Sequence, residues 1–256
     1  MNLVFASGFS FPQHLGIIDY FGGVAARFAG THETLFPPVQ PFGRSMDRAR
    51  QLADSIRDRN FPPGPIHIIA HSMGGLDSRY LIDANHHGLA APGRIATLTT
   101  LSTPHRGTPV ADLLLGSLFS RLIHRGVTVS IGALGLIGTG ALEDLTKDAA
   151  LQVPDVAKSH RHISYHSYAA TGRTTGKPTA AAFRATHDYI RDNSGQPNDG
   201  LVPMDSAEYG EFQGTVPCDH ADLVGHDLDL GLAGFKPVHL AMYDKIVGGL
   251  PARIKP

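Results

Sequence analysis

The chain has 256 residues, of which 42% are hydrophobic and 18% charged, and its formal net charge at pH 7 is −1. This length and composition favour one domain with a sizeable core, and the balanced charge argues against nucleic acid or an anionic membrane surface as a partner. The single cysteine, Cys218, excludes an intramolecular disulfide, and the sequence contains no apolar run long enough for a transmembrane segment.

The first residues do not resemble a secretory signal, because residues 1–6 contain no basic side chain and their apolar stretch is short. We therefore expect a cytoplasmic protein, or a secreted one whose signal lies outside this sequence. Residues 3–6 instead predict a first β-strand, which leads into Ser7-Gly8-Phe9.

Strand-like and helix-like segments alternate along the chain, a pattern typical of an α/β fold with a mostly parallel sheet. A helix is expected over about 46–56 with Ser45 as its N-cap, and a second helix over about 73–84. A closing helix is expected around 240–247. Further strands are predicted at 66–70, 95–101, 162–168 and within 208–216.

The stretch 109–150 interrupts this alternation. Apolar residues between 115 and 123 recur at helical spacing, and residues 127–142 are apolar and rich in glycine. One interpretation is a core helix. The other is a helical cap or lid, inserted into a single domain spanning 1–256, whose apolar underside covers the active site and meets lipid transiently.

The segment 66–81 carries the strongest chemical signal. An isoleucine-rich run ends in Ala70-His71-Ser72-Met73-Gly74, and a helical pattern follows. A small-x-Ser-x-Gly sequence between a strand and a helix is typical of a nucleophile elbow, in which the serine occupies a strained turn. Ser72 is therefore the candidate nucleophile.

A serine nucleophile of this type needs an acid and then a histidine later in the chain. Asp199, in Asn-Asp-Gly-Leu-Val, is the better acid, because its competitor Asp144 lies within the expected cap. His220 is the better base, with His226 as its rival, whereas His105 comes too early in the chain. In this arrangement Asp199 orients His220, which takes the Ser72 proton and returns it to the leaving group.

The tetrahedral oxyanion needs backbone donors as well as the three side chains. One donor is expected from Met73, directly after the nucleophile, and the other from Phe9 in the loop after the first strand.

The histidines at 160–166 and the single cysteine are two further candidates for a site. His160, His162 and His166 alternate along an expected strand, which favours a half-exposed face over a metal site. Cys218 lies near His220, but a small buried thiol is the simpler interpretation.

Taken together, three separated segments resemble the pseudomonad-type bacterial true lipases of the α/β-hydrolase superfamily. The segments are Ala-His-Ser-Met-Gly-Gly-Leu at 70–76, Ser-Thr-Pro-His-Arg-Gly at 102–107, and Asn-Asp-Gly-Leu-Val at 198–202 followed by Asp-His-Ala-Asp at 219–222. The resemblance implies Ser72, Asp199 and His220 as the triad and Phe9 and Met73 around the oxyanion. It also implies hydrolysis of acylglycerols or related carboxylic esters.

The chain departs from that family in four places. Ser7-Gly8 replaces the family's His-Gly, Ala70 replaces the first elbow glycine, and the usual disulfide is impossible. The fourth departure concerns calcium: Asp222 matches one calcium aspartate, but none stands near 177–179, where the second would fall. Asp222 is thus a weak calcium candidate, and its alternative role is to fix the histidine loop by hydrogen bonds.

The sequence therefore predicts a cofactor-independent lipase or esterase that acts on a small-molecule or lipid ester through an acyl-enzyme on Ser72. The same triad also suits an amidase, thioesterase, lactonase or acyltransferase. An inactive binding protein on a hydrolase scaffold is the alternative from another class, which the complete order of serine, aspartate and histidine disfavours.

Overall fold

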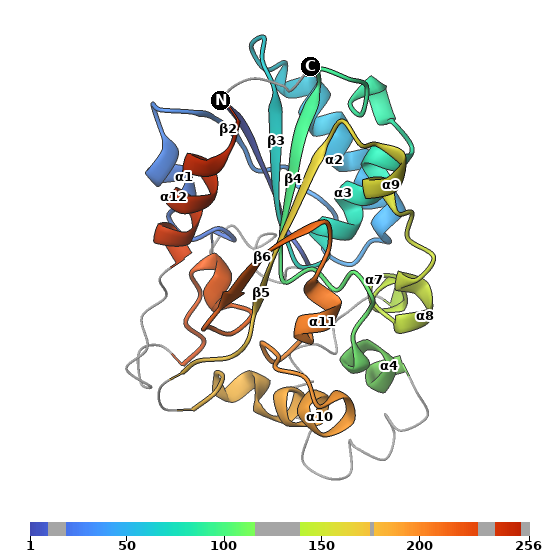
Figure 1. Ribbon diagram of the computed structural model, residues 1–256, viewed down its shortest axis with the longest axis vertical. Coiled ribbons are helices and arrows are strands. Elements are labelled where there is room, and N and C mark those ends of the chain that lie inside the picture. The colour runs from blue at the N-terminus through green and yellow to red at the C-terminus, as the bar shows by residue number, and fades with distance from the viewer. Residues whose placement is uncertain (10–18, 116–138, 175–176, 230–238, 252–256) are drawn as a thin grey trace.

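Six parallel strands form the centre of the computed structural model, which describes residues 1–9, 19–115, 139–174, 177–229 and 239–251 (Figure 1). The strand order across the sheet is β2-β1-β3-β4-β5-β6, and every neighbouring pair is parallel. The strands are β1 (Asn2–Ala6), β2 (Glu33–Leu35), β3 (Ile66–His71), β4 (Ile95–Leu101), β5 (Ser164–Ala170) and β6 (Glu211–Val216). The predicted mostly parallel sheet is confirmed.

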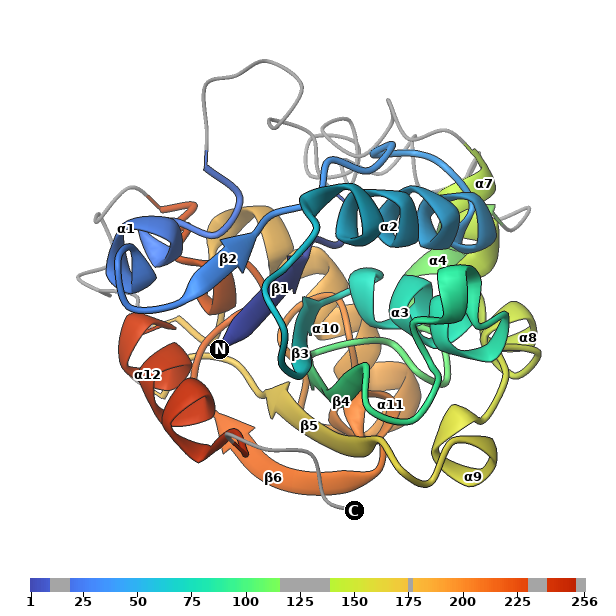
Figure 2. The ribbon, with the colours of Figure 1, turned by 90° about the horizontal axis from the view of Figure 1, so that it is seen from above.

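Helices cover both faces of the sheet (Figures 1 and 2). One face carries α1 (Val24–Phe28) and α12 (His239–Gly249), and the other carries α2 (Ser45–Arg59) and α3 (Gly74–Asp83). The other α-helices of the described residues are α4 (Pro109–Leu115), α7 (Thr139–Asp144), α8 (Lys147–Ala150), α9 (Val156–Ser159), α10 (Arg184–Ser194) and α11 (Met204–Ala207), and short 3-10 turns lie at His86–Gly88, Ala181–Phe183 and Asp222–Val224. None of the described helices combines the length and apolar composition needed to cross a bilayer.

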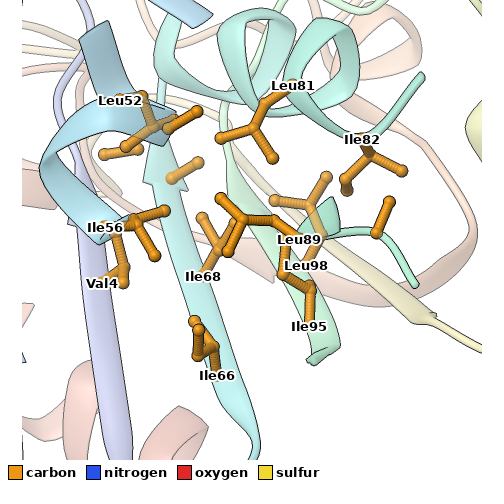
Figure 3. Packing of buried hydrophobic residues seen from close by; sticks show 14 of the residues in the cluster. Val4, Leu52, Ile56, Ile66, Ile68, Leu81, Ile82, Leu89, Ile95 and Leu98 are labelled. Carbon is orange, nitrogen blue, oxygen red and sulfur yellow. The ribbon is translucent and has the colours of Figure 1, made fainter. Parts of the chain in front are cut away.

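The two helical layers explain why the central strands are apolar without alternation. In β1, Val4 packs with the cluster beneath α2 and α3, whereas Leu3 and Phe5 pack with the cluster beneath α1 and α12. A parallel strand buried on both faces must be apolar on both. Figure 3 shows the α2 and α3 side, where Leu52 and Ile56 of α2 lie over the strands.

Most predicted elements are present, with two corrections. Ser45 is not an N-cap: Arg44 is, and Ser45 is a buried first helical residue whose N–H donates to Asp144 Oδ2 at 2.6 Å. His160 and His162 do not share a strand face with His166, because they precede β5. The predicted helix within 115–123 and most of the proposed cap fall outside the described residues, so the cap stays a prediction.

Candidate active site

Ser72 lies at the junction between β3 and α3, at the carboxyl edge of the sheet. Its φ is +56°, a left-handed conformation that costs a non-glycine residue roughly 1–3 kcal/mol. Neighbouring backbone holds it there: Ser72 N–H donates to Leu101 O at 2.9 Å, and Thr103 Oγ1 donates to Ser72 O at 2.7 Å. The strained turn that the elbow motif predicts is therefore present.

Glycines make this turn possible by close approach. A Cβ at Gly8 would lie 2.6 Å from Ser72 Cβ, and one at Gly74 would lie 2.7 Å from Ser7 O. A Cβ at Gly75 would lie 2.6 Å from Thr103 Cγ2. Real Cβ atoms do not approach other atoms this closely, so the backbone around Ser72 has no room for larger residues.

Asp199 and His220, the acid and the base that the sequence predicts, form a hydrogen-bonded pair. Asp199 Oδ2 lies 2.7 Å from His220 Nδ1, and both side chains are buried. The second carboxylate oxygen accepts the N–H groups of Leu201 and Val202 at 3.0 and 2.7 Å, and His220 N–H donates to Asp199 O at 3.0 Å. The carboxylate thus fixes the proton on Nδ1, which leaves Nε2 as the acceptor that a general base needs.

His220 lies beside the elbow. Its ring centroid is 4.5 Å from that of His71, the residue before Ser72. No hydrogen bond joins the Ser72 hydroxyl to His220 among the described contacts, and such bonds are often long before substrate binds.

The rival residues have other partners. Asp144 accepts from Ser45 N–H at the start of α2, and His226 Nε2 lies 3.0 Å from Tyr20 O. His105 lies between Arg79 and Thr100. Burial raises the pKa of the Cys218 thiol, which keeps it protonated and unreactive.

The two expected oxyanion donors are Met73, which follows Ser72, and Phe9, which follows Gly8 in the loop that approaches Ser72. Met73 is buried as the N-cap of α3, and Phe9 is half-buried with its ring 5.4 Å from Phe42. In the described part of the chain, no hydrogen bond occupies the N–H of either residue.

Tyr20 was not identified from the sequence, yet it supports the loop that lacks the family's histidine. Its hydroxyl accepts Gly8 N–H at 2.9 Å and lies 2.7 Å from His71 Nδ1. Burial raises the pKa of Tyr20 and lowers that of His71 well below its usual value, so Tyr20 O–H donates to a neutral imidazole. Tyr20 thereby ties the Phe9 loop to the elbow.

Arg48 supports the same loop from α2. Its guanidinium donates to Ser7 O at 2.8 Å and Gly8 O at 3.1 Å, and it forms a fully buried ion pair with Asp77 of α3 at 2.8 Å. Burial raises the pKa of Asp77 to about 6, while Arg48 opposes that shift. The helical spacing of α2 does not reveal this role, because only the fold brings Arg48 under the loop.

The calcium aspartate that the resemblance implies is already engaged. Asp222 Oδ1 and Oδ2 accept from the Arg173 guanidinium at 2.8 and 2.9 Å. Asp222 Oδ2 also accepts Asp219 N–H at 2.8 Å, so the alternative role of Asp222 in fixing the histidine loop fits the structure better than calcium binding.

Relatives with similar sequences are named as lipases. Triacylglycerol lipase 2 of Saccharomyces cerevisiae is 35% identical over 165 residues, which cover 62% of this chain and 45% of the yeast protein. A triacylglycerol lipase of Pseudomonas fragi is 25% identical over 252 residues, 84% of each chain. Residues 43–130 match a family model described as a PGAP1-like alpha/beta domain. The match to the yeast lipase spans less than half of that protein's length.

Solved structures of similar fold cover nearly the whole chain. A metagenomic carboxyl esterase has a TM-score of 0.74 at 18% identity, covering 98% of this chain and 76% of its own. Staphylococcus hyicus lipase has a TM-score of 0.66 at 20% identity, covering 96% and 94%. The chain therefore has the fold of these lipases and esterases, and its sequence is similar to those of triacylglycerol lipases.

Proposed function

We propose that this protein is a serine hydrolase that cleaves carboxylic esters through an acyl-enzyme on Ser72, with no required cofactor. The observation that carries the proposal is the buried Asp199–His220 pair beside a serine held at φ +56°. The relatives named triacylglycerol lipases support an acylglycerol or related lipid ester as substrate.

The proposed reaction has two halves. His220 takes the Ser72 proton as the hydroxyl attacks the acyl carbonyl, and the amides of Phe9 and Met73 receive the oxyanion. His220 then protonates the leaving alkoxide, and water cleaves the acyl-enzyme by the reverse proton path. Asp199 stabilises the imidazolium in both halves.

Hydrolysis of nitrophenyl esters by the wild type and by Ser72→Ala tests this function. The wild type should turn over, whereas the variant should lose turnover and keep its circular dichroism spectrum and Tm. Retained activity in Ser72→Ala would refute the proposed nucleophile, and a wild type active only on amides or thioesters would refute the ester substrate.

Acyl-chain length separates a lipase from a simple esterase. We expect the wild type to prefer long acyl chains and to gain activity at a lipid interface if residues 109–150 form the predicted cap. A short-chain optimum without interfacial gain would identify a carboxylesterase.

A further inference from the structure

A buried guanidinium lies at the centre of an acidic cluster next to the His220 loop. Arg173 follows β5, and its side chain is 1% exposed. Its Nη2 lies 2.8 Å from Asp222, 3.1 Å from Asp227 and 3.3 Å from Asp219, and its Nη1 lies 3.0 Å from Asp229. Arg173 Nη2 thus lies among three carboxylates, whose combined negative charge favours a cation at this point.

The same carboxylates shape the loop that carries His220. Asp219 Oδ1 accepts the N–H groups of Ala221 and Asp222 at 3.0 Å each, while Asp219 Oδ2 accepts Ala180 N–H at 2.9 Å. Asp219 precedes His220 and Asp222 follows it by two residues. A cation that binds both carboxylates therefore also fixes the backbone on both sides of His220. Without a cation the carboxylates would repel one another.

The cluster carries more negative charge than one guanidinium neutralises. Four carboxylates face a single arginine, and burial together with Asp222 raises the pKa of Asp219 to about 6. Three carboxylates around one point are also the oxygen ligands that Ca²⁺ takes. Calcium does not fit while Arg173 is present, because the guanidinium occupies these oxygens.

We propose that Arg173 is the built-in cation of the His220 loop, occupying the place where the lipase resemblance of the sequence implies calcium. Arg173 is a positioning residue whose influence on catalysis rests on the proposed role of His220. The proposal that calcium can replace the Arg173 guanidinium does not depend on the role of His220. It follows that a neutral side chain at position 173 turns a calcium-independent protein into a calcium-binding one.

Thermal unfolding and calorimetry of Arg173→Gln, in chelator and in millimolar calcium chloride, test the proposal without a substrate. The wild type should have the same Tm in both buffers. The variant should unfold about 10 °C lower in chelator, because a buried ion pair has lost one partner. Calcium should restore most of that loss, and calorimetry should detect calcium binding in the variant that the wild type lacks.

The matched control is Arg27→Gln, which breaks a half-exposed pair between Arg27 and Asp244 at 2.8 Å. Its Tm should stay near that of the wild type and ignore calcium. A wild type stabilised by calcium, or an Arg173→Gln variant that does not respond to it, would overturn the proposal. If Arg173→Gln does not fold, Arg173→Ala takes its place. Failure of both variants to fold even in calcium would count against the proposal.

Fluorophosphonate labelling of Ser72 separates a positioning role from a purely structural one. In chelator, Arg173→Gln should label up to about 100-fold more slowly than the wild type, since a displaced base activates the nucleophile poorly. Calcium should restore the rate, and an unchanged rate in chelator would remove Arg173 from the positioning of His220. Failure of the wild type to hydrolyse esters would instead refute the proposed function and leave the calcium results intact.

Discussion

At the scale of single residues, the proposed chemistry depends on a few side chains far apart in the sequence. The sequence identifies Ser72 from its local motif, and chain order then selects Asp199 and His220. The structure joins Asp199 to His220 at 2.7 Å and gives the rivals Asp144 and His226 other partners. Local patterns suffice to propose these residues because each candidate lies at a recognisable turn.

Asp199→Asn tests the role of the acid. The amide can hydrogen-bond to His220 but favours the wrong tautomer, so kcat should fall by about 10⁴ with little change in KM. Ester kinetics measure the loss. The exposed Asp205→Asn is the control, and a loss of less than tenfold in Asp199→Asn would contradict the assignment.

The supporting residues could not be predicted from the sequence. Tyr20 and Arg48 reach the Phe9 loop only because the sheet brings distant segments together. Arg173 likewise finds its aspartates 46 to 56 residues further along the chain. No periodic pattern marks such contacts, which depend on the tertiary structure.

Tyr20→Phe tests the support of the oxyanion loop. The change leaves the buried Gly8 N–H without an acceptor, at a cost of about 1–3 kcal/mol. A shift of the Gly8 backbone would also displace the neighbouring Phe9 amide, the proposed oxyanion donor. We therefore expect kcat to drop about tenfold while KM stays similar. Tyr243→Phe is the control, because that buried hydroxyl has no partner among the described residues. Equal kcat values in the two variants would contradict this role.

At the scale of elements, the long central strands and the amphipathic helices follow from the sequence, whereas the short elements do not. The strand prediction at 95–101 coincides with β4. By contrast, β2 has three residues and α1 five, too few for a periodic signal. The α10 helix is not predicted by its sequence, which is mostly polar and buries only Thr186, His187 and Ile190.

The contact between α3 and the loop after β4 makes Gly75 a sensitive position. Gly75→Ala forces a methyl group against Thr103, whose hydroxyl holds Ser72 O, and should destabilise the protein by about 1–3 kcal/mol. Urea denaturation measures this loss, and ester activity should fall with it. Gly249→Ala in α12 is the control, since nothing lies within 4 Å of its added Cβ. Equal stability of both variants would contradict the packing argument.

At the scale of the whole molecule, the parallel sheet gathers the site. All six strands point the same way (Figure 1), so the loops after β1, β3 and β4 meet at one edge and bring Gly8, Ser72 and Thr103 together. The sequence predicts this meeting because the carboxyl ends of parallel strands form the usual site of α/β folds. Whether 109–150 covers that edge stays a prediction.

The stability of the folded protein at acid pH depends on His67, which is buried in the central strand β3. Burial lowers the pKa of His67 from 6.5 to about 4, and its Nδ1 lies 2.9 Å from Thr97 Oγ1. In the unfolded chain His67 binds a proton below about pH 6.5, whereas in the folded chain it binds one only below about pH 4. The contribution of His67 to stability is therefore complete above pH 6.5 and is lost as the pH falls toward 4.

His67→Gln removes that dependence. Between pH 7 and pH 4.5, the free energy of unfolding of the variant should gain about 2–3 kcal/mol relative to the wild type. Urea denaturation at the two pH values measures the change. A difference between the two proteins that does not vary with pH would show that His67 titrates alike in both states.

Activation of the Ser72 hydroxyl by His220 is the step on which the proposed reaction depends. Mass spectrometry of peptides after reaction with a fluorophosphonate tests it directly, in the wild type and in His220→Ala. We predict one adduct on Ser72 in the wild type and strongly slowed labelling in His220→Ala. An adduct on another residue, or equal labelling of Ser72 in both proteins, would contradict the account.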